Sequence, residues 1–410
     1  MKFDKYQISD QLLRNLNDNG YFRTTDIQFK SIPSILKGED VLAIAQTGTG
    51  KTAAFAIPVI ERIDSRKASK RITGVRCLVM VPTRELAQQI GEVFNSLAKH
   101  TKVKSFAVYG GVEQDPQILK LQAGIDILIA TPGRMFGLIR QGFLDVQKID
   151  TLILDEADRM LGLGFLEDVR AIKRKLIHRH QTLFFSATIN PEIKKLAYSQ
   201  VRANAIRIQI SPDDPVSKNV THFVMFIEMD DKRFFLADYL RQNPDGKFII
   251  FVRTRVRAER VAKALERAEM QSLTIHGEKD QSGRTEALAS FRAGDCRVLI
   301  ATDVTARGID ISDVTHVINY DLPEKAENYV HRIGRTGRGF NKGIAVAFCS
   351  PLERPLLKEI ETLIAKKIDV LKVSKGDYEV IKAVEDDSLS LTEMIEREES
   401  FRKKAKRKKK

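Results

Sequence analysis

A glycine-rich turn near the start of the chain contains the residue types that can hold a nucleoside triphosphate. It follows the apolar run VLAIA (41 to 45) and precedes a stretch of helical period that begins at Ala53. Backbone N–H groups of such a turn can surround a phosphate, and the positive end of the following helix adds to the attraction. Lys51 would reach the β- and γ-phosphates, and the Thr52 hydroxyl would bind Mg²⁺. The candidate phosphate-binding residues are Ala45, Gln46, Thr47, Gly48, Thr49, Gly50, Lys51 and Thr52.

A cluster of acids downstream supplies the carboxylates that such a site needs. The apolar run TLILD ends in Asp155, and Glu156 and Asp158 follow it. Acid clusters are usually solvated loops, but a carboxylate at the carboxyl edge of a sheet lies where α/β folds bind their ligands. Asp155 is placed to hold Mg²⁺, and Glu156 can orient or deprotonate the attacking water. Together with the glycine turn, this cluster predicts an ATP and Mg²⁺ site.

Continuous apolar runs predict the strands that position these residues. Runs without alternation suit strands that are buried on both faces of a parallel sheet and wound with helices. The runs in the first half are 41 to 45, 77 to 81, 126 to 130, 151 to 155 and 182 to 186. Those in the second half are 247 to 252, 273 to 277, 297 to 303, 316 to 321 and 343 to 348. The pattern predicts an α/β protein with two domains of similar size, separated by a linker at QISPDDPVSK (209 to 218).

Charge favours a polyanionic partner such as nucleic acid. The chain has 68 Lys+Arg against 54 Asp+Glu in 410 residues, a net charge of +14,. Eight of the last nine residues, Arg402 to Lys410, are basic, so the rest of the chain carries +6. The segment from 372 to 410 is expected to be a helical or disordered basic extension. Whether it is a solvated appendage, an RNA tether, a protein-binding segment or a targeting signal is left open.

Cysteine usage and hydropathy limit the cellular compartments that fit the sequence. The three cysteines are far apart and have no metal-ligand spacing, which predicts buried, reduced thiols in a reducing compartment and no structural metal,. The N-terminus lacks the apolar stretch of a secretory signal, and no apolar run approaches the length of a membrane span,. We therefore expect a soluble, intracellular protein that does not associate with membranes.

Further strings occur in a fixed order along the chain. They include Pro82-Thr83-Arg84-Glu85-Leu86-Ala87, Ser186-Ala187-Thr188 and His331-Arg332-Ile333-Gly334-Arg335-Thr336-Gly337-Arg338. With the glycine turn and the acid cluster, they resemble the motifs of the DEAD-box RNA helicases of superfamily 2, over roughly residues 3 to 370. The resemblance implies two tandem RecA-like domains, each a mostly parallel sheet flanked by helices, at 1 to 208 and 219 to 371. In that family the two domains close over ATP and grip single-stranded RNA.

The resemblance implies further nucleotide contacts upstream of the glycine turn. Gly20 to Gln28 resembles the family's Q motif, with Thr24 and Asp26 where proline is common. It implies that Gln28 reads the adenine edge with its amide, that Tyr21 packs on the ring, and that Phe3 is the isolated upstream aromatic. Asp310 would contact the ATP ribose.

The resemblance also implies a set of RNA contacts that hold a strand without reading its bases. Threonine hydroxyls, exposed N–H groups and single arginines after successive strands would bind phosphate and ribose. In the first domain they are Pro82, Thr83, Arg84, Gly111, Thr131, Pro132, Gly133 and Arg134, and in the second domain Arg253 and Thr302.

A third set of residues would couple the ATP site to the RNA site. The hydroxyls of Ser186 and Thr188 would bond Asp158, and His331 would contact the loop that contains Asp158. Arg335 and Arg338 would point at the γ-phosphate as arginine fingers, a role worth roughly 10³ to 10⁵ in rate in related NTPases.

The implied function is that of an ATP-dependent RNA helicase that separates short duplexes locally or remodels RNA-protein complexes, with RNA-stimulated ATP hydrolysis. Two alternatives remain at this point: a DNA-directed ATPase of superfamily 2, and a non-processive RNA clamp or scaffold. The sequence does not distinguish ribosomal precursors, messengers and decay intermediates as the natural RNA. A compact core predicts a bacterial cytoplasmic enzyme, and a basic tail in a eukaryote would equally suit a nuclear one.

Overall fold

The first half of the chain forms an α/β unit around one seven-stranded parallel sheet. A computed structural model describes residues 1 to 45, 48 to 69, 73 to 210, 219 to 303, 313 to 337, 342 to 372 and Tyr378. The strands of the first sheet are β1 (Val41–Ile44), β2 (Cys77–Met80), β3 (Ser105–Val108), β4 (Ile127–Ala130), β5 (Thr151–Leu154), β6 (Gln181–Ser186) and β7 (Ile206–Gln209). Their order in the sheet is β3-β4-β2-β5-β6-β1-β7, with every pairing parallel.

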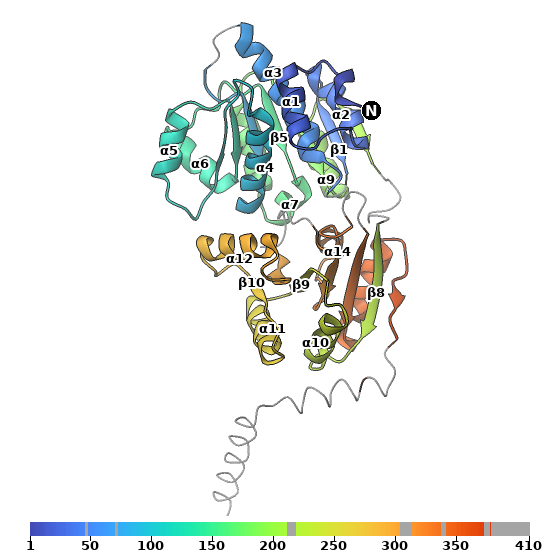
Figure 1. Ribbon diagram of the computed structural model, residues 1–410. Coiled ribbons are helices and arrows are strands. Elements are labelled where there is room, and N and C mark those ends of the chain that lie inside the picture. Colours follow the sequence, from blue (N-terminus) through green and yellow to red (C-terminus); the bar gives the residue numbers. More distant parts are fainter. Residues whose placement is uncertain are drawn as a thin grey trace, which may run out of the picture. The chain divides into compact units, whose positions relative to one another are not determined.

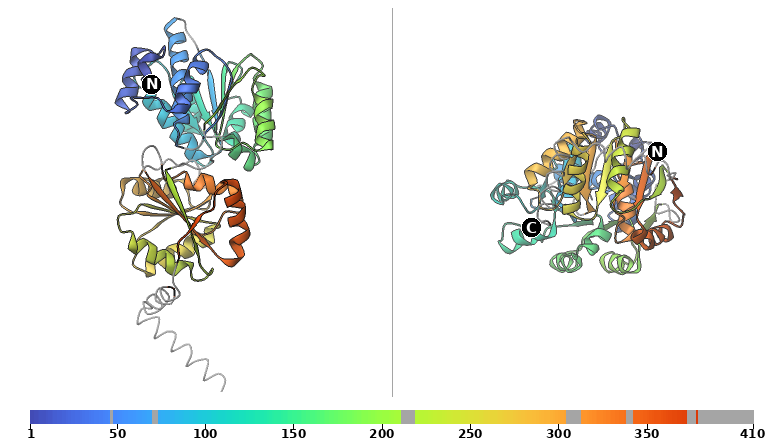
Figure 2. Two further views of the ribbon diagram at one scale, coloured as in Figure 1. Left: turned by 90° about the vertical axis from the view of Figure 1, so that its right-hand side faces the viewer. Right: turned by 90° about the horizontal axis from the view of Figure 1, so that it is seen from below.

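Helices cover both faces of this sheet (Figures 1 and 2). One face carries α1 (Asp10–Asp18), α2 (Asp26–Leu36), α3 (Lys51–Ser69) and α4 (Arg84–Ala98), preceded by the short helix η1 (Phe3–Lys5). The other carries α5 (Asp115–Gln122), α6 (Pro132–Arg140), α7 (Ala157–Gly162), α8 (Leu166–Lys175) and α9 (Pro191–Gln200). Alternate residues of each central strand enter the two cores: Val79 packs under α3 and α4, whereas Leu78 and Met80 face the other layer. This two-sided burial explains the continuous apolar runs.

The second half of the chain repeats the same topology. Its strands are β8 (Val220–Phe226), β9 (Phe248–Val252), β10 (Leu273–Ile275), β11 (Val298–Thr302), β12 (His316–Asn319), β13 (Gly343–Cys349) and β14 (Asp369–Val370). Their order is β10-β11-β9-β12-β13-β8-β14, which is the order of the first sheet with each strand replaced by its counterpart. The helices are α10 (Lys232–Gln242), α11 (Arg255–Arg267), α12 (Gln281–Ala293), α14 (Ala326–Ile333), η2 (Pro351–Glu353) and α15 (Arg354–Leu363). Two parallel sheets flanked by helices confirm the predicted fold class.

All ten apolar runs are strands. The four remaining strands lack a continuous apolar run for a common physical reason. Three of the four, β3, β7 and β14, lie at sheet edges. In β7 only Ile208 is buried, and β8 alternates between buried and less buried residues. Strands with one solvated face do not give a continuous apolar run.

The predicted linker and tail lie mostly outside the described residues. Gln209, the first residue of the predicted linker, belongs to β7 instead, and residues 211 to 218 are not described. Of the extension, the structure describes Lys372 and Tyr378, whose hydroxyl donates to Asp231 Oδ2 at 2.8 Å. All three cysteines are buried and free, as predicted. In the part of the chain that the structure describes, no helix has the length and apolar character to cross a bilayer.

Candidate active site

The predicted nucleotide residues gather over one half of the carboxyl edge of the first sheet. Strands β5, β6 and β1 are neighbours, and the loops that follow them contain the acid cluster, Ser186 with Thr188, and the glycine turn. The glycine turn is hydrogen-bonded to the end of β6, because Ala45 N donates to Ser186 O at 3.0 Å. The parallel order of the strands therefore brings together residues that are far apart in sequence.

Two glycines of the turn adopt backbone conformations that favour glycine. Gly48 and Gly50 adopt φ values of 81° and 91°, in the left-handed region that favours glycine,. Lys51 begins α3 with its side chain buried, and its Nζ donates to Ala45 O at 2.8 Å across the turn. Gln46 and Thr47 lie outside the described residues.

Gln28 is tied to the glycine turn. Its Nε2 donates to Gly50 O at 3.2 Å, and its Oε1 accepts from Thr25 N at 3.0 Å, which completes a capping box at the start of α2. A Cβ at Gly50 would overlap the Gln28 amide. The Thr-x-x-Gln spacing was a visible signal for this cap. Tyr21 is half-buried against the same core, and burial raises its pKa, while Phe3 is only 3% exposed within that core. Adenine contacts by these residues stay predictions.

Two buried carboxylates follow β5. Asp155 is 3% exposed and accepts from Glu156 N at 2.9 Å. Burial raises the pKa of Asp155 to about 6, and the positive charge of Lys51 partly opposes this shift,. Asp155 is therefore mostly ionised at pH 7. Glu156 has φ 49°, a conformation rare outside glycine, and its Oε2 accepts from the buried Arg159 Nη1 at 3.1 Å,. Sequence reasoning did not identify Arg159, although its i,i+3 spacing from Glu156 is the signal that could have found it,.

Of the two hydroxyls predicted to bond Asp158, that of Thr188 does so and that of Ser186 does not. Thr188 Oγ1 and Thr188 N both donate to Asp158 Oδ2, at 2.8 and 2.9 Å. Ser186 Oγ instead donates to Thr188 O at 2.8 Å. Ser186 is the last residue of β6 and is fully buried, so its hydroxyl meets the backbone of its own turn before it can reach the β5 loop.

The predicted RNA contacts of the first unit converge over the other half of the same edge, after β2, β4 and β3. Arg84 lies against Gly111, where an added Cβ would overlap the guanidinium and where φ is 79°. Arg134 Nη2 donates to Val112 O at 2.8 Å, so the first turn of α6 is joined to the same loop. Arg134 Nη1 is buried and has no hydrogen-bond partner among the described residues. Thr83 and Thr131 occupy the N-cap positions of α4 and α6.

Two adjacent guanidiniums make this half of the edge cationic. Burial lowers the pKa of Arg134, and the neighbouring charge of Arg84 lowers it further. Pro82 and Pro132 fix the backbone at the two strand ends, and Gly133 leaves its surroundings open, with nothing within 4 Å of an added Cβ,. Such a surface attracts phosphate groups.

In the second unit, a network of buried ions holds the predicted RNA residue Arg253. Its Nη2 donates to Leu322 O and to Glu353 Oε1, both at 3.3 Å, although 37% of its side chain is exposed. Glu353 also pairs with Lys232, which is fully buried at the start of α10. Thr302 ends β11, the neighbour of β9, and is 8% exposed.

Helix α14 and the turn after it contain the predicted coupling and arginine residues. His331 and Arg335 are buried, and Arg335 Nε donates to His331 O at 3.3 Å. Arg332, which the motif analysis passed over, is fully buried and pairs with Asp303 at 2.6 Å. Asp310 and Arg338 lie outside the described residues.

Comparison with known proteins agrees with this arrangement. A family model described as DEAD/DEAH box helicase matches residues 25–196, and one described as helicase conserved C-terminal domain matches residues 231–339. The chain is 40% identical over 369 residues to the DEAD-box ATP-dependent RNA helicase CshA of Bacillus cereus, an alignment that covers 90% of this chain and 69% of that protein. The chain belongs to the DEAD-box ATP-dependent RNA helicases.

Other relatives of this DEAD-box helicase come from bacteria and yeast. The ATP-dependent RNA helicase RhlB of Shewanella frigidimarina is 39% identical over 378 residues, which cover 91% of this chain and 87% of RhlB. The structure of S. cerevisiae Dbp5 bound to RNA and ADP BeF3 matches with a TM-score of 0.83 at 29% identity, covering 95% of this chain and all of that one. A structure of Mss116p bound to ssRNA and AMP-PNP matches with a TM-score of 0.83 at 26% identity over 93% of this chain and 80% of that one.

Family membership confirms the predicted activity. This DEAD-box helicase is an ATP-dependent RNA helicase with RNA-stimulated ATP hydrolysis. The repeated topology places a lysine at the start of the first helix after the first strand in both units. In the second unit a lysine again begins the helix after the first strand, but Lys232 Nζ is occupied by Tyr320 O at 2.7 Å and by Glu353.

Proposed function

We propose that the helicase cleaves ATP over β1, β5 and β6, with Glu156 activating the attacking water. Lys51 and the backbone of the glycine turn would hold the phosphates, and Gln28, Tyr21 and Phe3 would form the adenine side. The observation that carries this proposal is the gathering of Lys51, two buried carboxylates and the Asp158–Thr188 contact at one end of three neighbouring strands. In-line attack on a γ-phosphate needs little more than such positioned charges.

The donor set at this edge fits Mg²⁺. Asp155 offers a buried carboxylate that is ionised above a pKa of about 6, and Thr52, next to Lys51, offers a hydroxyl. Hard oxygen ligands of this kind, with bound water and phosphate oxygens, are what Mg²⁺ prefers. When bound, the ion would neutralise charge on the phosphates, while Asp155 and Thr52 hold it.

RNA would bind over β2, β3 and β4 through its backbone. The adjacent guanidiniums of Arg84 and Arg134, and the buried, unpartnered Nη1 of Arg134, support phosphate binding there. Gly111, with Thr83 and Thr131 at helix N-caps, leaves backbone N–H groups and hydroxyls for phosphate and ribose. In the second unit Arg253 and Thr302 would contribute the same kind of contact. Binding of this kind depends strongly on salt and little on sequence.

The second domain would complete the ATP site when the two domains close. We assign domain limits of 1 to 208 and 219 to 371, with Gln209 added to the first domain. Arg335 and Arg338 would act as arginine fingers, Asp310 would contact the ribose, and His331 would link to the loop that contains Asp158. Charge stabilisation would then be supplied only in the closed state.

The relatives support a bacterial, cytoplasmic setting. The matched CshA and RhlB proteins are named as ATP-dependent RNA helicases of bacteria. We propose that this helicase unwinds short RNA duplexes or remodels RNA-protein complexes in the cytoplasm, with ribosomal precursors and RNA-decay assemblies as the candidate settings.

A pair of substitutions on α6 tests the RNA assignment. Arg134→Gln removes the charge beside Arg84, and Arg140→Gln removes an exposed charge at the other end of the same helix. Single-stranded RNA affinity should fall for Arg134→Gln alone, with a log–log salt slope smaller by about 0.7, the value for one phosphate contact. ATP affinity should not change. Equal RNA affinity for both variants would contradict the assignment.

A further inference from the structure

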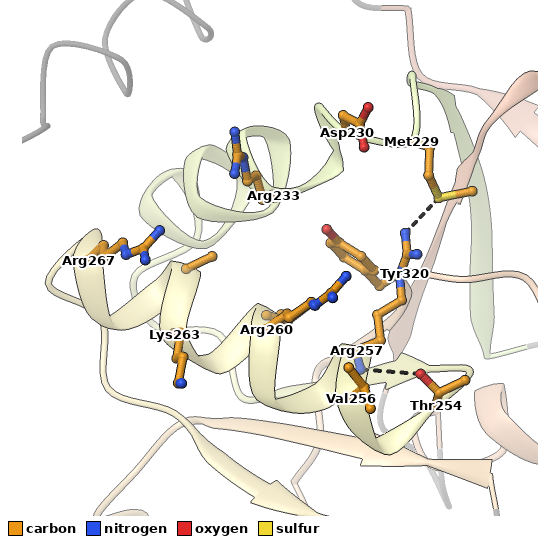
Figure 3. A pocket seen from close by; sticks show the side chains of 12 residues that line it. Met229, Asp230, Arg233, Thr254, Val256, Arg257, Arg260, Lys263, Arg267 and Tyr320 are labelled. Atoms are coloured by element: carbon orange, nitrogen blue, oxygen red, sulfur yellow. Dashed lines mark hydrogen bonds between the residues drawn. The ribbon is translucent and has the colours of Figure 1, made fainter. Parts of the chain in front are cut away.

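A cationic groove lies on the second unit, between α10 and α11. Its volume is about 380 Å³, and Figure 3 shows Arg233 on α10, with Arg257, Arg260, Lys263 and Arg267 along α11. Asp230 is the one acid among the residues that line it. Five basic side chains and one carboxylate line this concave surface, so the groove carries an excess of positive charge,.

Four of these cations form no salt bridge within the described part of the chain. Arg233, Arg260, Lys263 and Arg267 are exposed, and among the described residues none of them forms an ion pair. Arg257 differs, because its Nε pairs with the buried Asp321 at 3.0 Å and its guanidinium lies over the Tyr320 ring. Unpaired like charges held close together repel one another, and a bound polyanion would relieve that repulsion.

The base of the groove is fixed by buried contacts. Lys232, at the start of α10, donates to Tyr320 O at 2.7 Å, and Tyr320 lines the groove. Phe235 and Leu240 on α10 and Val261 and Leu265 on α11 pack into one core on the second sheet. The cationic side chains therefore project from two helices whose spacing is set by the fold, and the surface is present before any ligand arrives.

The groove adjoins one of the two predicted RNA-binding residues of the second unit, Arg253. Thr254 lines the groove and follows Arg253 in the loop after β9. From Arg257 to Arg267 the α-helix rises about 15 Å. A stacked strand has one phosphate about every 3.4 Å along its axis, so this row can face roughly four phosphates.

We propose that the α10–α11 groove binds the backbone of RNA that extends beyond the Arg253 loop. This inference rests on the RNA helicase function and adds a second, sequence-independent contact to it. An acidic protein partner is the less favoured ligand, because protein interfaces are anchored by apolar side chains in pockets. Among the apolar residues that line the groove, only one is exposed, Val256; the others are Met229, Val261, Ala264 and Tyr320.

Two triple variants of the full chain test the proposal. The groove variant is Arg260→Gln, Lys263→Gln and Arg267→Gln, which spares Arg257 and its buried partner. The control variant is Lys358→Gln, Lys366→Gln and Lys367→Gln, which removes the same charge from exposed positions in and after α15. Affinity is measured by fluorescence anisotropy with a non-hydrolysable ATP analogue, at several salt concentrations, for single-stranded RNAs of about 10 and about 30 nucleotides.

The groove variant should bind the longer RNA roughly tenfold more weakly, and its log–log salt slope should fall by about 2, the value for three single-strand phosphate contacts. Affinity for the shorter RNA and its stimulation of ATP hydrolysis should remain unchanged, and the control variant should match the wild type. Unchanged affinity for the longer RNA would overturn the proposal. So would a variant that binds that RNA normally but loses binding to polyglutamate, which would identify an acidic protein as the ligand. An unmodified protein that binds neither RNA would instead contradict the helicase function.

Discussion

Thr188 binds Asp158 with two donors, its hydroxyl at 2.8 Å and its backbone N–H at 2.9 Å, and so joins the loops after β5 and β6. Asp158 lies in the first turn of α7, two residues after Glu156, the residue proposed to activate water. A movement of the β6 loop would therefore displace the proposed catalytic loop as well. We propose that this contact couples nucleotide chemistry to RNA binding.

Thr188→Val keeps the side-chain shape and the N–H donor but removes the hydroxyl. A hydrogen bond to a charged group is worth about 2 kcal/mol, so coupling should weaken by roughly thirtyfold. We expect RNA unwinding to fall by this factor while ATP affinity changes little. Strand-displacement and nucleotide-binding assays measure the two quantities. Ser186→Ala is the control, since that hydroxyl donates to the Thr188 carbonyl and not to Asp158; an equal loss of unwinding in the control would refute the coupling role.

Glu156→Gln should abolish turnover without abolishing binding. The amide can still accept from Arg159, but it cannot take a proton from water,. General-base catalysis contributes about 10² to 10⁴ in rate, and steady-state ATP hydrolysis with RNA should fall by that factor. Affinities for ATP and RNA should remain near normal. Glu167→Gln, which loses an exposed pair with Arg170, should hydrolyse ATP normally; normal hydrolysis by Glu156→Gln would remove that residue from the mechanism.

Gly50→Ala should disrupt nucleotide binding more than its backbone strain alone explains. An alanine at φ 91° costs about 1 kcal/mol, and its Cβ would also displace the Gln28 amide,. We expect ATP affinity, measured by titration calorimetry, to fall at least tenfold. Gly38→Ala has a similar φ of 80°, but its nearest neighbour would be Arg62 at an ordinary 3.6 Å. Comparable losses in both variants would assign the effect to strain and not to the Gln28 contact.

His316 should make the second unit less stable in mild acid. Its ring stacks on that of Phe248 with 4.7 Å between the ring centroids, and burial lowers the pKa of His316 below the usual 6.5. As pH falls through 6.5, the unfolded chain takes up a proton that the folded state resists, so the free energy of unfolding decreases. The slope is at most about 1.4 kcal/mol per pH unit. Denaturant unfolding of His316→Phe between pH 7.5 and 5.5 should show a smaller pH dependence than the wild type. The exposed His178→Gln should follow the wild type, and identical curves for His316→Phe would disprove the assignment.

The sequence allowed prediction of the central strands and the loops after them, because strands buried on both faces leave continuous apolar runs. It could not show how loops far apart in sequence contact one another. The approach of Arg134 to Val112 and of Arg84 to Gly111 depends on β3 lying beside β4, an order that local patterns do not encode. Arg159 and Arg332 were missed for a different reason: a buried arginine paired within its own unit has the same sequence appearance as a solvated one.

The failed prediction for Ser186 has a similar cause. Hydroxyls two residues apart look equivalent in sequence, but the end of β6 turns one toward its own backbone and the other toward Asp158. Such choices depend on local backbone direction, which residue types alone do not determine. Residues 379 to 410 lie outside the described structure, so the role of the basic tail stays a prediction.

The most direct test of the account is the rate of ATP hydrolysis by the purified protein without nucleic acid, with structured RNA, and with DNA of the same sequence. Backbone contacts that include the ribose, at loops matched to those of RNA helicases, predict strong stimulation by RNA and little by DNA. Equal stimulation by DNA, or no stimulation by either nucleic acid, would contradict the central claim that RNA binding stimulates ATP hydrolysis at this site.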